Sequence, residues 1–392
     1  MDDSGGLWDL AVVGAGPAGA AAALAALRRD PGARVLILDR AAFPRDKPCG
    51  DGVALHALDV LAGLGLPQLA SDHRAVHRLH LGYPGGAGVT GTMRRPAYVI
   101  PRVIFDARIL AGALAAGASL QRRTVRRVQP RADRVVLDGE FAARVVIAAD
   151  GALSAARRGL GLARNGHGHL AVAIRGYAPV RPDLAREQRI AFGRGDWPAY
   201  AWSFPIGDGR ANVGYGEVRR GGRPLTRAHL LDRLDALLPG CAEDAMAWRA
   251  HHLPLSSHRP RQPDGRVLLA GDALSLINPM TGEGIFYAVL SGACAGAAAV
   301  AGLAAAATNP GAAYRGELRR RLGRHLAHTT LTARLARRPR LVDAALAAAG
   351  RESGTFDALV ELGLGQGLLT SGALAGTARQ LLRRGGSALE GR

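Results

Sequence analysis

The feature that most constrains the fold is the segment VVGAGPAG at residues 12–19, which contains the pattern Gly-x-Gly-x-x-Gly. The first Gly permits a tight turn, the second lets a pyrophosphate approach the backbone, and the third lets a helix pack closely on a strand. An apolar run precedes the segment and an Ala-rich run follows it, which predicts a strand, a turn and a helix. We expect Gly14, Gly16 and Gly19 to place the helix N-terminus against the phosphates of a dinucleotide.

A second apolar run, ARVLILDR at residues 33–40, follows the predicted helix and contains Asp39 near its end. Two strands joined by a helix form the βαβ unit of a parallel, doubly wound sheet. A carboxylate at the end of the second strand can accept hydrogen bonds from ribose hydroxyls. These residues therefore predict a Rossmann-like dinucleotide site, without distinguishing NAD from FAD.

Two later segments favour FAD. VVIAADG at residues 145–151 is a predicted strand that ends in Asp150, and RVLLAGDALSLINPMTGEGI at 266–285 is a strand that leads into Asp272. An aspartate in that position can hold a ribityl hydroxyl. Gly282 and Gly284 then begin a helix whose N–H groups can face the negative charge of reduced flavin. The alternative is that NPMTGEG is only a helix cap.

The patterning of the chain changes along its length, which predicts the domain organisation. The central part shows short alternating runs separated by turns, as in antiparallel sheets, and the last part is helical and basic. We predict an α/β fold with a discontinuous Rossmann-like FAD-binding domain, an inserted antiparallel β-sheet substrate domain and a helical C-terminal section. The predicted boundaries are 1–75, 101–163 and 263–310 for the FAD-binding domain, 76–100 and 164–262 for the substrate domain, and 311–392 for the C-terminal section.

The loop FPRDKPCGDG at residues 43–52 contains the only lysine of the chain, Lys47, beside Cys49. The segment follows the second predicted strand and its expected ribose contact, Asp39. Lys47 would supply a compact, rotatable ammonium, and Gly50 and Gly52 would let the backbone approach a flat ring. We interpret the loop as facing the cofactor or the substrate, with Cys49 as the candidate catalytic residue. The alternative is a Pro- and Gly-rich loop that happens to hold one Lys and a buried Cys.

A cluster of aromatic residues lies in the sequence AYAWSFP at 199–205. In a strand, Tyr200, Trp202 and Phe204 share one face, because side chains alternate with a period of two. That face could line an apolar cavity over the flavin and so contact the substrate. The alternative is that these rings pack in the core of the sheet. We expected the nearby His251, His252 and His258 to be surface or strand residues, because no metal-ligand spacing surrounds them.

Three of these segments together resemble a known fold. VVGAGPAG, ADGALSAAR and GDALSLINPMTGEGI resemble the class A flavoprotein monooxygenases, and FPRDKPCGDG with NPMTGEGI resembles the geranylgeranyl reductase family. The resemblance covers about residues 9–300, and YAWSFP is similar to the Tyr-x-Trp-x-Phe-Pro block on the family's substrate side. Arg102 lies in the family's Arg-x-x-Phe-Asp pattern, and Asp39 stands where many relatives have Glu. The resemblance implies FAD contacts for Gly14, Ala15, Gly16, Gly19, Asp39, Arg40, Arg102, Asp272, Gly284 and Ile285.

The family resemblance implies a function. We expect an FAD-dependent oxidoreductase that reduces carbon–carbon double bonds of an isoprenoid or similar apolar substrate by hydride transfer from flavin N5. NAD(P)H or a ferredoxin would be the transient electron donor, because no second dinucleotide motif is visible. The alternative is an FAD-dependent monooxygenase acting on an aromatic or polyketide-type substrate. A halogenase lacks support, since YAWSFP differs from the Trp-x-Trp-x-Ile-Pro run of flavin halogenases. A flavin-free binding protein is opposed by the intact glycines and Asp272.

Composition limits the partners and the location. The formal net charge is +19, which indicates an anionic partner or, as the alternative, only a compositional bias toward Arg. The basic clusters contain no aromatic residues, which argues against a platform that stacks single-stranded bases, so a membrane surface suits them better than nucleic acid. Three scattered cysteines predict neither a disulfide framework nor a metal site. We expect a cytoplasmic protein, with peripheral membrane contact as an option. The Ala- and Gly-rich segment 288–308 is long enough to span a membrane, but we expect a buried helix.

Overall fold

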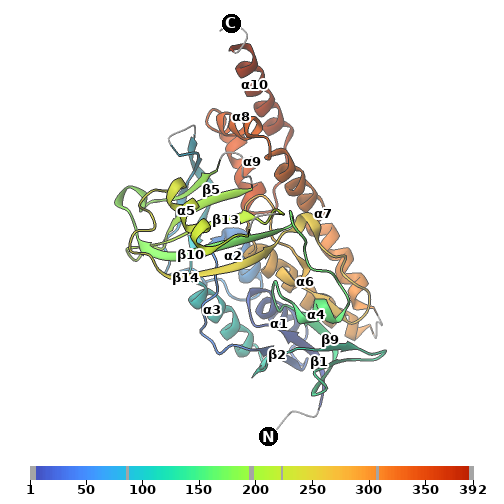
Figure 1. Cartoon of the computed structure of the whole chain (residues 1–392). Coiled ribbons are helices and arrows are strands. Elements are labelled where there is room, and N and C mark those ends of the chain that lie inside the picture. Colours follow the sequence, from blue (N-terminus) through green and yellow to red (C-terminus); the bar gives the residue numbers. More distant parts are fainter. Residues whose placement is uncertain (1–5, 85–87, 194–197, 222–223, 306–308, 388–392) are drawn as a thin grey trace.

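The computed structural model describes residues 6–84, 88–193, 198–221, 224–305 and 309–387. Two sheets dominate it, with helices around and beyond them (Figure 1). The first sheet lies nearer the N-terminus and the second above it in the view of Figure 1, and the C-terminal helices lie at the opposite end from the N-terminus. The fold is mixed α/β, as the sequence predicts.

The first sheet is the predicted Rossmann-like sheet, with β1 parallel to both β2 and β9. Strand β9 pairs with β8 at one end and with β15 at the other, so β15 returns to this sheet late in the chain. The sheet consists, in order, of β6 (Ser119–Arg122), β2 (Val35–Asp39), β1 (Leu7–Val13), β9 (Phe141–Ala148), β8 (Val135–Leu137) and β7 (Val128–Pro130), with β15 (Val267–Leu269) beside β9.

Two long Ala-rich helices pack against each other beside this sheet: α1 (Pro17–Arg29) and α6 (Ile285–Ala304). Their backbones approach so closely that a Cβ on Gly292 would lie 2.0 Å from the carbonyl oxygen of Ala18. This contact explains why the segment is rich in Ala and Gly. By length and composition α6 could cross a membrane, but 67% of its most apolar window is buried, as in a core helix.

The second sheet is antiparallel except for one parallel pair, β4 with β11. One face packs against α5 (Arg227–Leu237) through Ala199, Ala201 and Val213, and the other face points toward the first sheet and the C-terminal helices. Its strands are, in order, β14 (Met246–Pro254), β10 (Leu170–Pro179), β13 (Arg210–Val218), β12 (Ala199–Pro205), β11 (Glu187–Phe192), β4 (Val76–Gly82), β5 (Gly88–Val99) and β3 (Gly52–Ala54).

The C-terminal helices connect the two sheets. Helix α7 (Pro310–Leu335) packs against α6 and runs along one side of the molecule (Figure 1). Helices α8 (Pro339–Ala349) and α9 (Ser353–Leu364) pack on β5, where Phe356 lies against Gly91, and α10 (Ser371–Ser387) packs on both. The remaining helices are α2 (Leu55–Gly63), α3 (Arg102–Ala115) and α4 (Ala155–Gly159).

The domain boundaries that the sequence suggests stay a prediction. Strand β3 pairs with β5 of the second sheet, although the prediction assigned all of residues 1–75 to the FAD-binding domain. Strand β3 directly follows the loop that holds Lys47 and Cys49. The pairing therefore ties the end of that loop to the second sheet.

Candidate active site

A cavity of about 1180 Å³ extends between the two sheets and under the C-terminal helices. At one end it is lined by the Gly turn after β1, and at the other by apolar side chains of α7 to α10. Of the site residues predicted from the sequence, Ala15 and Gly19 do not line the cavity. Those that do are Gly14, Gly16, Asp39, Arg40, Lys47, Cys49, Gly50, Arg102, Tyr200, Trp202, Phe204, Asp272, Gly282, Gly284 and Ile285.

The glycines of the turn have the steric roles that the motif requires. Gly14 has φ +100°, and a Cβ on it would lie 2.3 Å from the carbonyl oxygen of Ala149. A Cβ on Gly19 would lie 1.8 Å from the carbonyl oxygen of Gly14, so a side chain there would separate helix from strand. Asp39 accepts hydrogen bonds from the N–H groups of Ala15 at 2.7 Å and Ala41 at 2.8 Å. Asp39 therefore braces the turn while lining the cavity.

Two arginines meet at Asp106 of α3, close to this turn: Arg102 from the start of the helix and Arg45 from the loop at residues 43–52. Arg102 is buried and donates to both oxygens of Asp106, at 2.5 and 2.7 Å. Burial would lower the pKa of Arg102, but the charge of Asp106 raises it well above the ordinary value. Arg45 pairs with the same carboxylate at 3.0 Å and lies 3.3 Å from the position of a Cβ on Gly16. Our sequence interpretation missed Arg45, although it stands two residues before Lys47.

The loop at residues 43–52 meets the late motif across the cavity. The Nζ of Lys47 lies 3.3 Å from an oxygen of Asp272, which is three residues beyond the end of β15. The two residues are separated by 225 positions in the chain. Both were predicted to face the cofactor, and the structure brings them into an ion pair at the cavity wall.

A buried polar network fixes the same loop to the second sheet. Asp51 is fully buried with φ +58°, and one of its carboxylate oxygens accepts from Tyr177 at 2.6 Å and Asn212 at 2.8 Å. Asn212 also donates to the carbonyl of Cys49 at 2.8 Å and accepts from the indole N–H of Trp202 at 2.9 Å. Asn212 therefore couples the position of the loop to the orientation of a residue predicted to contact the substrate.

Burial determines the protonation of two groups on this loop. Burial raises the pKa of Asp51 to about 6, opposed by the hydrogen bonds from Tyr177 and Asn212. Burial also raises the pKa of the Cys49 thiol, opposed by the charge of Arg102. Cys49 therefore stays a neutral thiol at neutral pH.

A Cβ on Gly50 would lie 3.4 Å from the indole nitrogen of Trp202, so here the glycine accommodates a ring of the protein itself.

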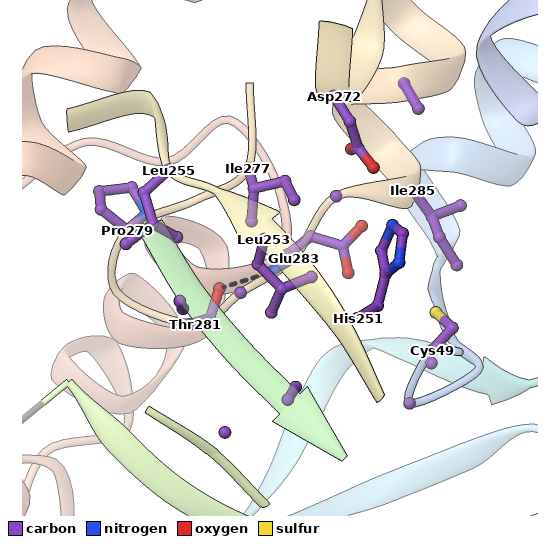
Figure 2. A pocket seen from close by; sticks show the side chains of 18 of the residues that line it. Cys49, His251, Leu253, Leu255, Asp272, Ile277, Pro279, Thr281, Glu283 and Ile285 are labelled. Atoms are coloured by element: carbon purple, nitrogen blue, oxygen red, sulfur yellow. Dashed lines mark hydrogen bonds between the residues drawn. The ribbon is translucent and has the colours of Figure 1, made fainter. Parts of the chain in front are cut away.

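The N-terminus of α6 differs from what we expected. Gly282 has φ +70° and Gly284 is the N-cap residue, but a side chain already caps the helix. Glu283 accepts from the N–H of Phe286 at 2.8 Å, and Figure 2 shows its carboxylate directed toward the cavity side chains. Burial raises the pKa of Glu283 to about 7, opposed by the backbone N–H groups of Phe286 and Ile285. The amides assigned to flavin are thus partly occupied by a carboxyl that titrates near neutrality.

His251 lies on strand β14, as expected for a surface or strand residue, and it also lines the cavity. Its ring lies between Glu283 and Ile285 in Figure 2, on the cavity face of β14, and its Nε2 is buried without a hydrogen-bond partner. Burial and, secondarily, the positive charge of Lys47 lower the pKa of His251 to about 4. The residue is therefore neutral at neutral pH. Arg249 and Leu253 line the cavity on the same face of β14, but the local sequence does not show that this face meets a cavity.

The far end of the cavity is apolar and comes from a region in which the sequence showed no motif. The aromatic strand β12 forms part of the wall, and the hydroxyl of Tyr200 donates to the carbonyl of Thr281. Opposite it, α8, α9 and α10 contribute only aliphatic side chains and one Thr to this part of the lining. This apolar arm is lined by Leu341, Val342, Ala345, Leu346, Leu359, Val360, Gly363, Leu364, Ala373, Leu374, Thr377, Ala378 and Leu381.

Comparisons with known proteins agree with this geometry. The FAD binding domain family matches residues 8–186. Menaquinone reductase of Mycobacterium tuberculosis is 35% identical over 313 residues, covering 74% of this chain and 76% of that protein. Digeranylgeranylglycerophospholipid reductase 1 of Methanopyrus kandleri is 34% identical over 311 residues, covering 75% and 80%.

The fold also matches a solved structure along nearly its whole length. A geranylgeranyl bacteriochlorophyll reductase-like protein from Thermoplasma acidophilum superposes with a TM-score of 0.74 at 22% identity, covering 96% of this chain and 98% of that one. This likeness shows the fold, and the two reductases, which match about three quarters of the chain at 34% and 35% identity, show the family. The chain therefore belongs to the geranylgeranyl reductase family of FAD-dependent oxidoreductases.

Proposed function

We propose that this enzyme reduces carbon–carbon double bonds in an isoprenoid or similar apolar chain. The observation that carries the proposal is one continuous cavity that joins a dinucleotide cradle to a long apolar arm. Such an arm suits a flexible hydrocarbon chain, because it offers aliphatic surface without polar partners. Menaquinone and digeranylgeranylglycerophospholipid, named in two relatives, both carry isoprenoid chains.

We propose that FAD occupies the cradle end of this cavity. Three observations fit it: the glycine turn leaves no room for side chains, two arginines lie beside the turn, and Asp150 has a buried oxygen without a hydrogen-bond partner. Arg45 and Arg102 would hold the diphosphate, and Lys47 with Asp272 would face the ribityl chain and the ring. Asp39 would accept a hydrogen bond from a ribose hydroxyl, and it would then lose its hydrogen bond from the N–H of Ala15.

When bound and reduced, FAD supplies a hydride for one alkene carbon. The residues of the chain have three tasks around that transfer. Trp202 and Phe204 orient the substrate chain against the loop, and the packed arm excludes water. Cys49 holds a proton on Sγ at the cavity wall because burial raises its pKa. We propose that this proton goes to the second alkene carbon, so that two hydrogens are added in total.

The electron donor and the location belong to this proposal. We propose NAD(P)H or a ferredoxin as a transient donor, since the cavity holds one dinucleotide motif. We also propose a cytoplasmic protein in peripheral contact with a membrane, because isoprenoid lipids reside there. A purified enzyme reconstituted with either donor would distinguish the two through the rate of flavin bleaching.

The test is product analysis after incubation with a panel of prenyl and aromatic compounds. The FAD-loaded protein is reduced without oxygen, and the products are examined by mass spectrometry. A gain of two hydrogens in a prenyl compound supports the proposal. A product that gains one oxygen, and only when air is present, replaces it with the monooxygenase alternative.

A further inference from the structure

The apolar arm of the cavity opens to the surface between α7 and α10. Leu335 and Leu374 both line the cavity, yet they are 36% and 51% exposed. The N–H of Leu369 donates to His328 at 3.0 Å, so the start of α10 is held beside α7. Because these two cavity-lining side chains reach solvent, they mark the mouth of the cavity.

Exposed leucines continue beyond this mouth on both helices. Leu331 lies one turn before Leu335 on α7 and is 48% exposed, and Leu382 lies two turns after Leu374 on α10 and is 77% exposed. Residues four apart on a helix share a face, so each pair lies on the side of its helix that carries the mouth. Single exposed leucines are ordinary in folded proteins, but four around one opening form a patch that indicates an interaction site.

The patch is bordered by positive charge. Arg334, Arg337, Arg338 and Arg340 follow one another through the turn from α7 to α8 and are all exposed. None of the four forms an ion pair with another residue in the part of the chain that the structure describes. On α10, Arg379 pairs with Glu352, and Arg383 is exposed. The border therefore carries a net positive charge.

We propose that this mouth face, made of Leu331, Leu335, Leu374 and Leu382 with Arg334, Arg337, Arg338, Arg340 and Arg383, docks on a bilayer that contains anionic phospholipids. The leucines enter the acyl region and the arginines meet the headgroups. Helix α10 projects beyond the rest of the fold in Figure 1, which suits it for partial insertion. The inference rests on the proposed function, because it gives an isoprenoid chain a path from the bilayer into the cavity without crossing water.

A bilayer fits this face better than a protein partner. The patch is continuous with an apolar cavity, and a protein that covered it would close the cavity to its substrate. Arginines in an exposed turn without carboxylate partners can all reach one plane of lipid phosphates. Each basic residue near an anionic surface contributes about a fivefold change in binding, so three of them contribute roughly a hundredfold.

The experiment measures sedimentation of the FAD-loaded full chain with vesicles. Phosphatidylcholine vesicles are compared with vesicles that also contain phosphatidylglycerol, and we expect salt-sensitive binding to the anionic ones only. The variant Leu331→Ser/Leu382→Ser changes residues that do not line the cavity, and it should weaken binding at least about tenfold. Arg334→Gln/Arg337→Gln/Arg338→Gln should weaken it by roughly a hundredfold.

A control carries Leu114→Ser/Leu120→Ser, two exposed leucines on α3 and β6 that are 38% and 37% exposed. Equal vesicle binding by wild type and the mouth variant, or equal loss in the control, overturns the proposal. So does a dimer in vesicle-free solution that the mouth variant converts to a monomer, because a second copy then covers the face. Vesicle binding without reduction of any prenyl compound leaves the docking face intact and refutes the proposed function instead.

Discussion

Replacing Asp51 with Asn should make the protein more stable at neutral pH, which is unusual for a buried residue in a hydrogen-bond network. One carboxylate oxygen accepts from both Tyr177 and Asn212, and the other is buried without a partner. The amide oxygen of Asn can take over both bonds, while its NH₂ group occupies the unpartnered position. Asn also tolerates the φ of +58° better than most residues.

The magnitude follows from the pKa. Burial raises the pKa of Asp51 from 3.8 to about 6, so the folded protein retains a proton that the unfolded chain has released. The part of the free energy of unfolding that depends on protonated Asp51 is therefore fully present below pH 3.8, and it is lost as the pH rises through about 6. Each pKa unit corresponds to about 1.4 kcal/mol, so the ionised carboxylate lowers the free energy of unfolding by about 3 kcal/mol. The Asp51→Asn variant has no carboxyl at this position, so its free energy of unfolding does not fall in this way.

The assay is urea unfolding followed by circular dichroism, with and without FAD, at pH values from about 4 to about 8. Wild type and Asp51→Asn should agree at the acid end and diverge to about 3 kcal/mol above pH 7. Asp133→Asn, an exposed aspartate, is the control and should leave the pH profile unchanged. Parallel profiles for wild type and Asp51→Asn, or a less stable Asp51→Asn at pH 8, would refute the reasoning.

Three further predictions concern packing and the site. Gly292→Ala should lower the free energy of unfolding by at least about 3 kcal/mol in urea titrations, because its Cβ would meet the backbone of Ala18. The control Gly316→Ala should not lower it, because a Cβ there meets no atom within 4 Å. Glu283→Gln should raise the reduction potential of bound flavin at pH 8 but not at pH 6, measured with reference dyes, because the carboxyl ionises near pH 7. Asn212→Leu leaves the indole N–H of Trp202 unpaired; we expect a lower kcat with FAD affinity retained, and equal loss of both would contradict a positioning role.

The sequence by itself determined the parts of this protein that depend on local backbone geometry. Gly14 and Gly19 could be assigned because the turn between a strand and a helix excludes side chains whatever the rest of the chain does. The common face of Tyr200, Trp202 and Phe204 followed from the period of a strand, and all three line the cavity. For Lys47 and Asp272 we predicted only that both face the cofactor, and their ion pair with each other was not predicted.

Tertiary structure alone decided which distant residues meet. Asn212 contacts a loop 161 residues earlier, and nothing in the local sequence of β13 marks it, because a hydrogen bond between strands and loops depends on how two sheets pack. The same holds for His251, whose strand faces a cavity only because of how the two sheets pack. It also holds for Glu283, whose carboxyl accepts a hydrogen bond from the first turn of the helix that follows it. The sequence predicted the C-terminal section only as helical and basic, and its role in lining the cavity depends on how it packs against the rest of the chain. Spacing fixes the direction of a side chain from its own backbone, whereas packing fixes what lies in that direction.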